Sequence, residues 1–144
     1  MSISDSEVFE RVPAPIFIDR DNIDFWRGFL EHRLLINKCA DCGNWYQPSY
    51  PVCPKCESWD VHPTEASGRG EIFTFTILHT GGSRGVDYKA GHPVAVVELP
   101  EQAGLRVTGT IVNCAHEDIR IGMPVELTWI DRNGLDIPAW QPAG

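Results

Sequence analysis

Residues 39–56, CADCGNWYQPSYPVCPKC, hold four cysteines in two pairs, Cys39 with Cys42 and Cys53 with Cys56. Each pair has the spacing C-x-x-C, and ten residues separate the pairs. A zinc ion binds four thiolates in a tetrahedron with Zn–S bonds of about 2.3 Å, and two such pairs joined by a short hairpin supply them at that distance. The pattern predicts a zinc ribbon. Because all four ligands are cysteines, no position is left for water or substrate, and the metal is predicted to be structural.

Disulfides, a redox C-x-x-C pair or an iron centre would use the same cysteines. Residues 1–10 are polar and acidic and lack the apolar stretch of a secretory signal peptide, so we expect a cytoplasmic protein, in which disulfides are rare. A redox C-x-x-C motif is usually a single pair beside a βαβ pattern, whereas this chain has two pairs and no such pattern around them. Iron bound by the same four thiolates stays an alternative, although zinc is the commoner metal in such sites.

The residues that follow the two cysteine pairs differ. Gly43 follows the first pair, where a tight turn with positive φ favours glycine, whereas Glu57 follows the second. We therefore expect the second turn to be strained or differently shaped.

Composition narrows the class of protein. The chain has 144 residues, of which 42% are hydrophobic, enough for a core in one medium domain or two small ones. Its formal charge is -8, and acidic residues are in excess in both halves. Apolar runs such as 93–97 are far shorter than the roughly 20 residues of a membrane helix, so we expect no membrane span.

Two segments precede the cysteines. Pro13 and Pro15 oppose a helix and predict an extended arm over residues 1–20. After Asp21 or Asn22, either of which can cap a helix, apolar residues recur at helical spacing as far as residue 31: Ile23, Trp26, Phe29 and Leu30.

Short strands dominate the rest. Residues 33–38 are predicted to lead as a strand into the first cysteine pair, 45–52 to form a hairpin before the second, and 63–70 to be a polar connection. Five runs then have strand character, with a brief helical turn at 117–119: residues 70–79, 93–99, 105–112, 124–130 and 135–140, with a turn at 131–134 before the last. Five is the strand number of an OB-fold. The predicted fold is mainly β: an N-terminal arm and helix (1–36), a rubredoxin-like zinc ribbon (37–62) and a five-stranded OB-fold barrel (63–144).

Several short motifs follow one another along the chain in a characteristic order. They are Phe25-Trp26, Arg33-Leu34-Leu35, Cys39-x-x-Cys42-Gly43, Cys53-Pro54-x-Cys56, Gly68-x-Gly70 before Thr74-Phe75-Thr76, DIRIGMPVE at 118–126, and IPAWQP at 137–142. In this order they resemble the zinc-ribbon/OB-fold acyl-CoA-associated proteins, long known only as a domain of unknown function. Glu57 follows the second cysteine pair, where members of this family usually have glycine. Trp140 stands where phenylalanine is commoner in the family.

The resemblance implies an accessory subunit whose partner carries the catalytic residues. The implied partner is a thiolase-superfamily enzyme, such as a thiolase or acyltransferase, with an acyl-CoA hydratase or aldolase as the alternative. The implied role is to stabilise the partner and shape its acyl-CoA entrance. Zinc is then a structural cofactor, and a coenzyme A thioester is the ligand of the complex.

Residues 80–91 form a glycine-rich loop between two predicted strands, flanked by His79 and His92. Arg84 and Lys89 could pair with the phosphates of coenzyme A, and Tyr88 could stack on its adenine or close the channel. By its composition alone the segment is an ordinary surface loop, and the resemblance is what favours a coenzyme A site. The two histidines are expected to form hydrogen bonds at strand ends.

Aromatic residues before and within the ribbon are candidates for a protein interface, because aromatic anchors dominate interface energetics. We expect the partner interface at Phe17, Phe25 and Trp26. Trp45, Tyr46 and Tyr50 on the ribbon hairpin serve either such an interface or the small ribbon core.

Two other classes of function stay as alternatives. A nucleic-acid-binding module would need a cationic groove with aromatic platforms, which the acidic balance opposes unless Arg84, Lys89 and Arg106 share a face. A free-standing acyltransferase would need Cys114 as a nucleophile oriented by His116, and a small buried core residue is the simpler interpretation of that cysteine.

Overall fold

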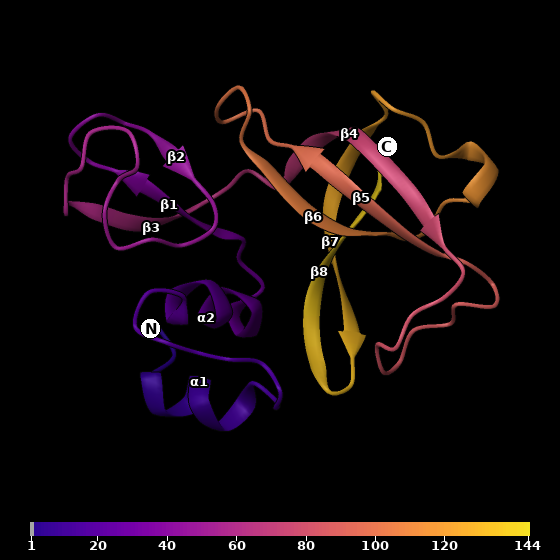
Figure 1. Cartoon of the computed structure of the whole chain (residues 1–144), viewed down its shortest axis with the longest axis horizontal. Coiled ribbons are helices and arrows are strands. Elements are labelled where there is room, and N and C mark those ends of the chain that lie inside the picture. Colours follow the sequence, from indigo (N-terminus) through magenta and orange to yellow (C-terminus); the bar gives the residue numbers. More distant parts are fainter. Residues whose placement is uncertain (1) are drawn as a thin grey trace. The chain divides into compact units, whose positions relative to one another are not determined.

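The computed structural model describes residues 2–144, and its elements are labelled in Figure 1. The chain divides into two compact units. One unit extends to Ser67 and includes Gly134–Asp136, and the other contains Gly68–Asn133 and Ile137–Gly144. In chain order the elements are α1 (Asp5–Arg11), α2 (Ile23–Glu31), β1 (Leu35–Cys39), β2 (Trp45–Tyr46), β3 (Val61–Glu65), β4 (Arg69–Leu78), β5 (His92–Glu98), β6 (Arg106–Ile111), the 3-10 helix η1 (His116–Asp118), β7 (Pro124–Arg132) and β8 (Leu135–Pro142).

Helix α1 corrects the prediction of an extended arm over residues 1–20. Ser4 caps this helix, because its hydroxyl accepts a hydrogen bond from the Glu7 N–H (3.4 Å) while the Glu7 carboxylate accepts one from the Ser4 N–H (3.2 Å). Such a capping box satisfies two of the N–H groups that a helix start leaves unpaired. Pro13 and Pro15 come after the helix has ended at Arg11, so they do not prevent it.

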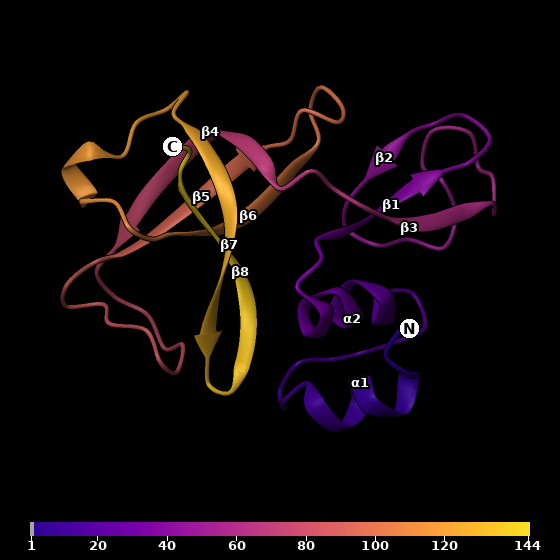
Figure 2. The same ribbon diagram turned by 180° about the vertical axis from the view of Figure 1, so that it is seen from behind.

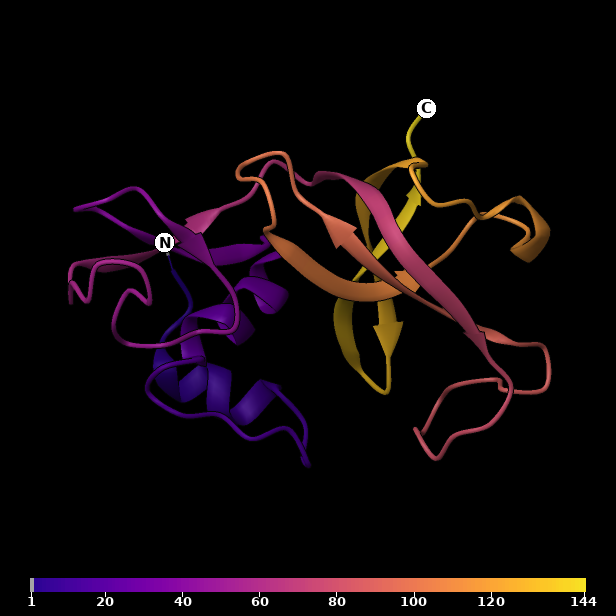
Figure 3. The same ribbon diagram turned by 45° about the horizontal axis from the view of Figure 1, so that its top comes forward.

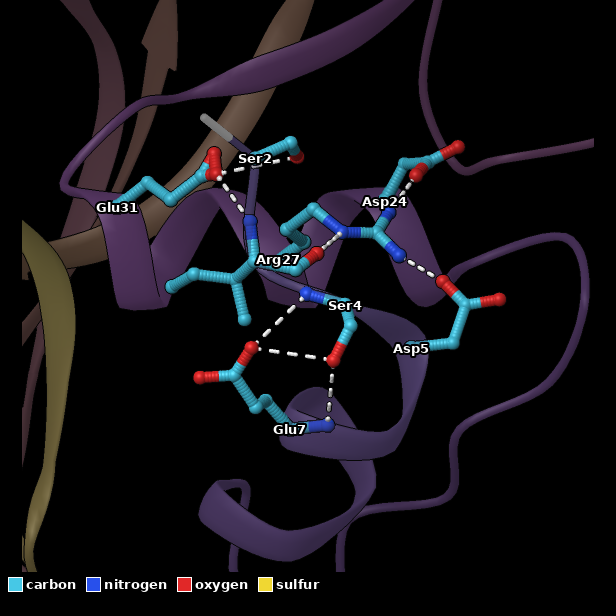
Figure 4. A network of polar contacts seen from close by, with 8 residues as sticks. Ser2, Ser4, Asp5, Glu7, Asp24, Arg27 and Glu31 are labelled. Carbon is cyan, nitrogen blue, oxygen red and sulfur yellow. Dashed lines mark hydrogen bonds and ion pairs between the residues drawn. The ribbon is translucent and has the colours of Figure 1, made fainter.

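Arg27 of α2 holds the segment around α1 in place, as Figure 4 shows. Its guanidinium is buried, and it donates hydrogen bonds to the carbonyl of Ile3 (2.6 Å) and to the carboxylates of Asp5 and Asp24. A buried cation needs such partners because its desolvation is costly when it is unpaired. Helix α1 also buries one apolar side chain, that of Val8.

The predicted helix after Asn22 is confirmed as α2. The Asn22 side chain does not cap it but orders the preceding turn, accepting from the Asp19 N–H (2.8 Å) and donating to the Phe17 carbonyl (3.0 Å). At the other end the Arg33 N–H donates to the carbonyl of Gly28 (2.8 Å). A Cβ at position 28 of α2 would lie 2.3 Å from the Arg33 carbonyl oxygen, so only glycine fits where the chain turns back against the helix.

The ribbon sheet has the strand order β2-β1-β3, and Figure 2 shows β1 between its two neighbours. Strand β3 was missed by the sequence interpretation, because Pro63 and its polar neighbours resemble a connection. It pairs with β1 over five positions, from Leu35 opposite Glu65 to Cys39 opposite Val61, and so crosses the predicted boundary between residues 62 and 63. Proline is acceptable here because β3 is an edge strand.

The second unit is a closed barrel with the order β4-β5-β6-β8-β7, which confirms the predicted five-stranded OB-fold (Figures 1 and 3). Strands β6 and β8 pair in parallel, and β5 pairs antiparallel with both β4 and β6. The turn between β7 and β8 has positive φ at Asn133 (55°) and Gly134 (88°), as a tight hairpin turn requires. The barrel interior is filled by fully buried side chains: Ile72, Val97, Leu99, Val125 and Trp140.

In the part of the chain that the structure describes, no helix has the length and apolar character needed to cross a membrane.

Candidate functional site

The four predicted metal ligands come together in the ribbon. Their sulfur atoms all lie within 4.8 Å of one another. The Sγ atoms of Cys39 and Cys56 are 3.6 Å apart, as are those of Cys42 and Cys53. Ligands at about 2.3 Å from a tetrahedral zinc would be about 3.8 Å from each other, so the sulfur cluster fits the ion.

The two cysteine pairs lie on matching turns. Cys39 and Cys53 are buried and their carbonyls accept hydrogen bonds from the N–H of Gly43 and of Glu57, each at 2.9 Å. Positive φ angles occur at both positions, 74° for Gly43 and 63° for Glu57. The prediction of a differently shaped second turn is therefore wrong, while Glu57 does hold the left-handed conformation that costs a side-chain-bearing residue free energy.

The thiol pKa values show what the cluster requires. Burial opposes ionisation of Cys53, but hydrogen bonds from the backbone of Cys56 and Lys55 lower its pKa to about 6. For Cys56, a backbone hydrogen bond from Ser58 lowers the pKa, yet the sulfur of Cys42, burial and the other cluster sulfurs raise it to about 12. Four sulfurs this close cannot all be thiolates without a cation among them.

A metal held here is structural. Cys39, Cys42, Cys53 and Cys56 would complete the tetrahedral shell of zinc, which supplies cross-linking of the two turns and no open coordination position. The apolar core around it is small, consisting of the two buried cysteines, Tyr46 and the half-buried Val61.

The second candidate site is the loop between β4 and β5, which projects beyond the ends of these strands (Figures 1 and 3). Tyr88, predicted to stack on adenine or to close the channel, makes its contacts within this loop. Its hydroxyl accepts a hydrogen bond from the Ser83 N–H (3.3 Å), and a Cβ at Gly81 would lie 2.3 Å from its ring. The ring also meets His92 edge-on, with 6.1 Å between centroids. Tyr88 therefore orders the loop, while Arg84 and Lys89 are exposed on it.

Cys114 is half-buried rather than the core residue that the sequence favours, and its thiol donates to the Ala115 carbonyl (3.5 Å). The His116 ring turns toward the end of the β4–β5 loop, where its Cε1 atom would lie 3.3 Å from a Cβ at Gly91. The Cε1 atom of His79 would lie 3.1 Å from the same point, so two imidazoles gather beside this glycine.

The predicted interface residues differ in their exposure. Phe17 is 77% exposed. Phe25 and Trp26 are half-buried and pack against Phe29, with ring centroids 5.0 and 4.8 Å from it. Tyr46 belongs to the ribbon core, and its hydroxyl donates to the Tyr50 carbonyl (2.6 Å). The structure adds exposed side chains that the sequence interpretation missed: Phe9, Trp59, Phe73 and Ile121.

Arg84, Lys89 and Arg106, the three cations whose grouping would favour nucleic-acid binding, do not share a face. The Arg106 guanidinium lies 3.6 Å over the Phe73 ring and pairs with Glu98 (3.0 Å), so this cation already has an aromatic and an acidic partner. Arg106 lies opposite Glu98, the last residue of the seven-residue strand β5. Arg84 and Lys89 lie on the loop before the first residue of that strand, so about 20 Å of strand separates them from Arg106. The cavity of about 400 Å³ beside Phe73 is lined by one cation, Arg69, and by two carboxylates, Glu71 and Glu98, a balance that does not favour phosphate.

Comparison with known proteins gives a consistent result. Residues 26–62 match the family described as "ChsH2, rubredoxin-like zinc ribbon domain", and residues 63–129 match "ChsH2, C-terminal OB-fold domain". A "DUF35 domain-containing scaffold protein" of Methanocaldococcus jannaschii is 36% identical over 110 residues, which are 75% of this chain and 76% of that protein. The chain belongs to the ChsH2/DUF35 family.

Other members of the ChsH2/DUF35 family extend the comparison. The solved structure "Ltp2-ChsH2(DUF35) aldolase" contains a chain that is 34% identical, with a TM-score of 0.79 over 92% of this chain and 100% of that one. A "Probable enoyl-CoA hydratase alpha subunit" of Thermomonospora curvata is 35% identical over 132 residues, 91% of this chain. The chain spans only 40% of the length of that relative.

Proposed function

We propose that the chain is an accessory subunit of an enzyme complex that acts on acyl-CoA thioesters. The observation that carries this proposal is the match along the full length of a chain from the Ltp2-ChsH2 aldolase structure, at a TM-score of 0.79. That structure's description names a second protein, Ltp2, beside the ChsH2 chain. A closed four-cysteine metal centre agrees with a supporting role, because it leaves no coordination position for chemistry.

The partner that we propose is a thiolase-superfamily enzyme. It would carry the catalytic residues, and this chain would help to shape its acyl-CoA entrance. Exposed aromatic side chains, above all Phe17 at 77% exposure, are the anchors we assign to that contact. Phe25 and Trp26 lie on the same unit, and the half-exposed parts of their rings are further candidates for that contact.

A second candidate partner is an acyl-CoA hydratase. It is favoured by the Thermomonospora curvata relative, described as a probable enoyl-CoA hydratase alpha subunit, of which this chain spans 40%. In this case the partner would add water to an enoyl thioester, and this chain would again contribute structure.

The experiment is to purify the zinc-loaded, tagged chain from its native lysate and to assay the stoichiometric partner with and without it. Carbon–carbon bond formation or cleavage, or acyl transfer, by the complex supports the thiolase-type partner, and hydration of an enoyl-CoA supports the second candidate. Activity should be lost with Phe17→Ser if this side chain anchors the partner, and kept with Cys114→Ala. Co-purification of nucleic acid alone, or a complete reaction by the isolated chain that Cys114→Ala abolishes, would overturn the accessory role.

A further inference from the structure

The β4–β5 loop is fastened to the turn between β7 and β8, a neighbourhood that the sequence does not indicate. The Asn133 side-chain amide donates a hydrogen bond to the Arg84 carbonyl (3.0 Å). Gly85 faces the same turn, since a Cβ there would lie 2.8 Å from the Asn133 Oδ1 atom and 3.4 Å from Cδ of Arg132. The last residue of β7 is therefore adjacent to the basic part of the loop.

Arg132 also lies close to the base of this loop. Burial and the positive charge of Arg132 together lower the pKa of His92, the first residue of β5. Tyr88, the residue before Lys89, packs on the same His92, so the charge of Arg132 acts on the base of the segment that carries Lys89. The β4–β5 loop and the end of β7 thus bring three cations to one end of the barrel: Arg84, Lys89 and Arg132.

These three cations are available to a ligand. None of their side chains makes a hydrogen bond or ion pair with any of residues 2–144, and Arg84 and Lys89 are exposed. The nearest carboxylate on the loop, Asp87, accepts hydrogen bonds from the N–H groups of Lys89 (3.0 Å) and Ala90 (3.2 Å). Asp131 precedes Arg132 on β7, so its side chain points to the opposite face of the strand.

We propose that Arg84, Lys89 and Arg132 form a binding surface for a diphosphate group or a comparable multiply charged phosphate. Guanidinium and ammonium groups form short, charge-assisted hydrogen bonds with phosphate oxygens, and the ordered loop presents them with little loss of backbone freedom on binding. Given the proposed function, on which this assignment of the ligand rests, the source is the phosphate-bearing end of coenzyme A, and a free nucleotide carries the same chemistry.

The test is calorimetric titration of the isolated, zinc-loaded chain with four probes: pyrophosphate, ATP, coenzyme A and pantetheine. Binding of the three phosphate compounds, but not of pantetheine, supports the surface. Tighter binding of coenzyme A than of ATP identifies coenzyme A as the source, and equal binding assigns the surface to any carrier of the phosphates. Absence of phosphate binding, or equal binding of pantetheine, overturns the proposal.

Single substitutions show whether the three named residues are responsible. Arg132→Gln should weaken pyrophosphate binding about tenfold, the value of one lost hydrogen bond to a charged group. Arg20→Gln removes the same charge from an exposed residue of the other unit and should leave binding unchanged. Equal loss in both variants would indicate attraction by overall charge and would overturn a defined surface. Because the isolated chain is used, a failure here is distinct from a failure to find the acyl-CoA enzyme.

Discussion

At the scale of single residues, Glu57 is a place where the chain accepts backbone strain. Its φ of 63° repeats the left-handed conformation of Gly43 in the first cysteine turn. This conformation costs a residue with a side chain about 1–2 kcal/mol, whereas glycine adopts it freely but loses more conformational entropy on folding. We expect Glu57→Gly to raise the free energy of unfolding by up to about 1 kcal/mol, measured as a higher urea midpoint at fixed free zinc.

Gly43 provides the matched control for that substitution. A Cβ at this position would meet nothing within 4 Å, so Gly43→Ala adds backbone strain and no clash. It should lower the free energy of unfolding by about 1 kcal/mol. If neither variant shifts the urea midpoint, the left-handed backbone is not a source of strain in this ribbon.

His92 gives the barrel a dependence on pH with a defined sign. Its pKa in the folded chain is lowered from 6.5 by burial and by Arg132. The unfolded chain therefore binds more protons between the two pKa values, and the free energy of unfolding decreases as the pH falls through about 6.5 toward the folded value. His92→Gln should flatten this slope in urea titrations between about pH 7 and pH 5.

Nuclear magnetic resonance can follow the same histidine directly. Arg132→Gln removes one of the two causes of the shift and should raise the pKa of His92 in a titration of its ring protons. Arg106 of β6 pairs with Glu98, at the end of β5 that is remote from His92. Arg106→Gln should therefore leave the pKa of His92 unchanged. An unchanged pKa in the Arg132 variant would place that cation away from the loop and would also remove it from the proposed phosphate surface.

At the scale of secondary-structure elements, we expect the anchoring of α1 to depend on Arg27. Arg27→Ala would leave the Ile3 carbonyl unpaired and the carboxylates of Asp5 and Asp24 without their shared cation. Because the Asp5 side chain is 70% exposed and that of Asp24 45%, we expect a loss of only about 2 kcal/mol. Hydrogen exchange should show lost protection across α1.

Arg20→Ala is the control for this element. Arg20 is 85% exposed and pairs only with its sequence neighbour Asp21 among the described residues, so its loss should change stability by less than about 0.5 kcal/mol. If α1 stays equally protected in both variants, its anchoring comes from Val8 instead.

The same elements show what the sequence could predict. The cysteine spacing and the alternating runs were enough for the ribbon and the barrel, because both depend on local patterns of ligands and apolar side chains. Helix α1 carried a capping box, Ser4 with Glu7, that the prolines after it obscured. Strand β3 had no local signal, since its pairing is supplied by β1. Arg132 joined the candidate phosphate surface only through the tertiary contact of Asn133 with Arg84.

At the scale of the whole molecule, the two units should respond differently to metal removal. The apolar cluster around the metal site consists of Cys39, Cys53, Tyr46 and Val61, which is too little apolar surface to order the two cysteine turns without the ion. Chelation should therefore abolish hydrogen-exchange protection in the two cysteine turns and in β2. The barrel has its own core, including Ile72 and Trp140, and its strands should remain protected. Simultaneous loss in both units would show that they fold as one cooperative body.

The place of β8 in the barrel also constrains how the chain can fold as it is synthesised. This strand is the last of the five barrel strands to be synthesised, yet it lies between β6 and β7 and pairs with β6 through Thr110 opposite Ala139. Until it emerges, β6 and β7 expose two unpaired edges, which are templates for aggregation. The cysteine ribbon, complete much earlier in translation, can capture its metal while the barrel still waits for its final strand. Premature termination before residue 135 would then release a chain with a finished ribbon and a permanently open barrel.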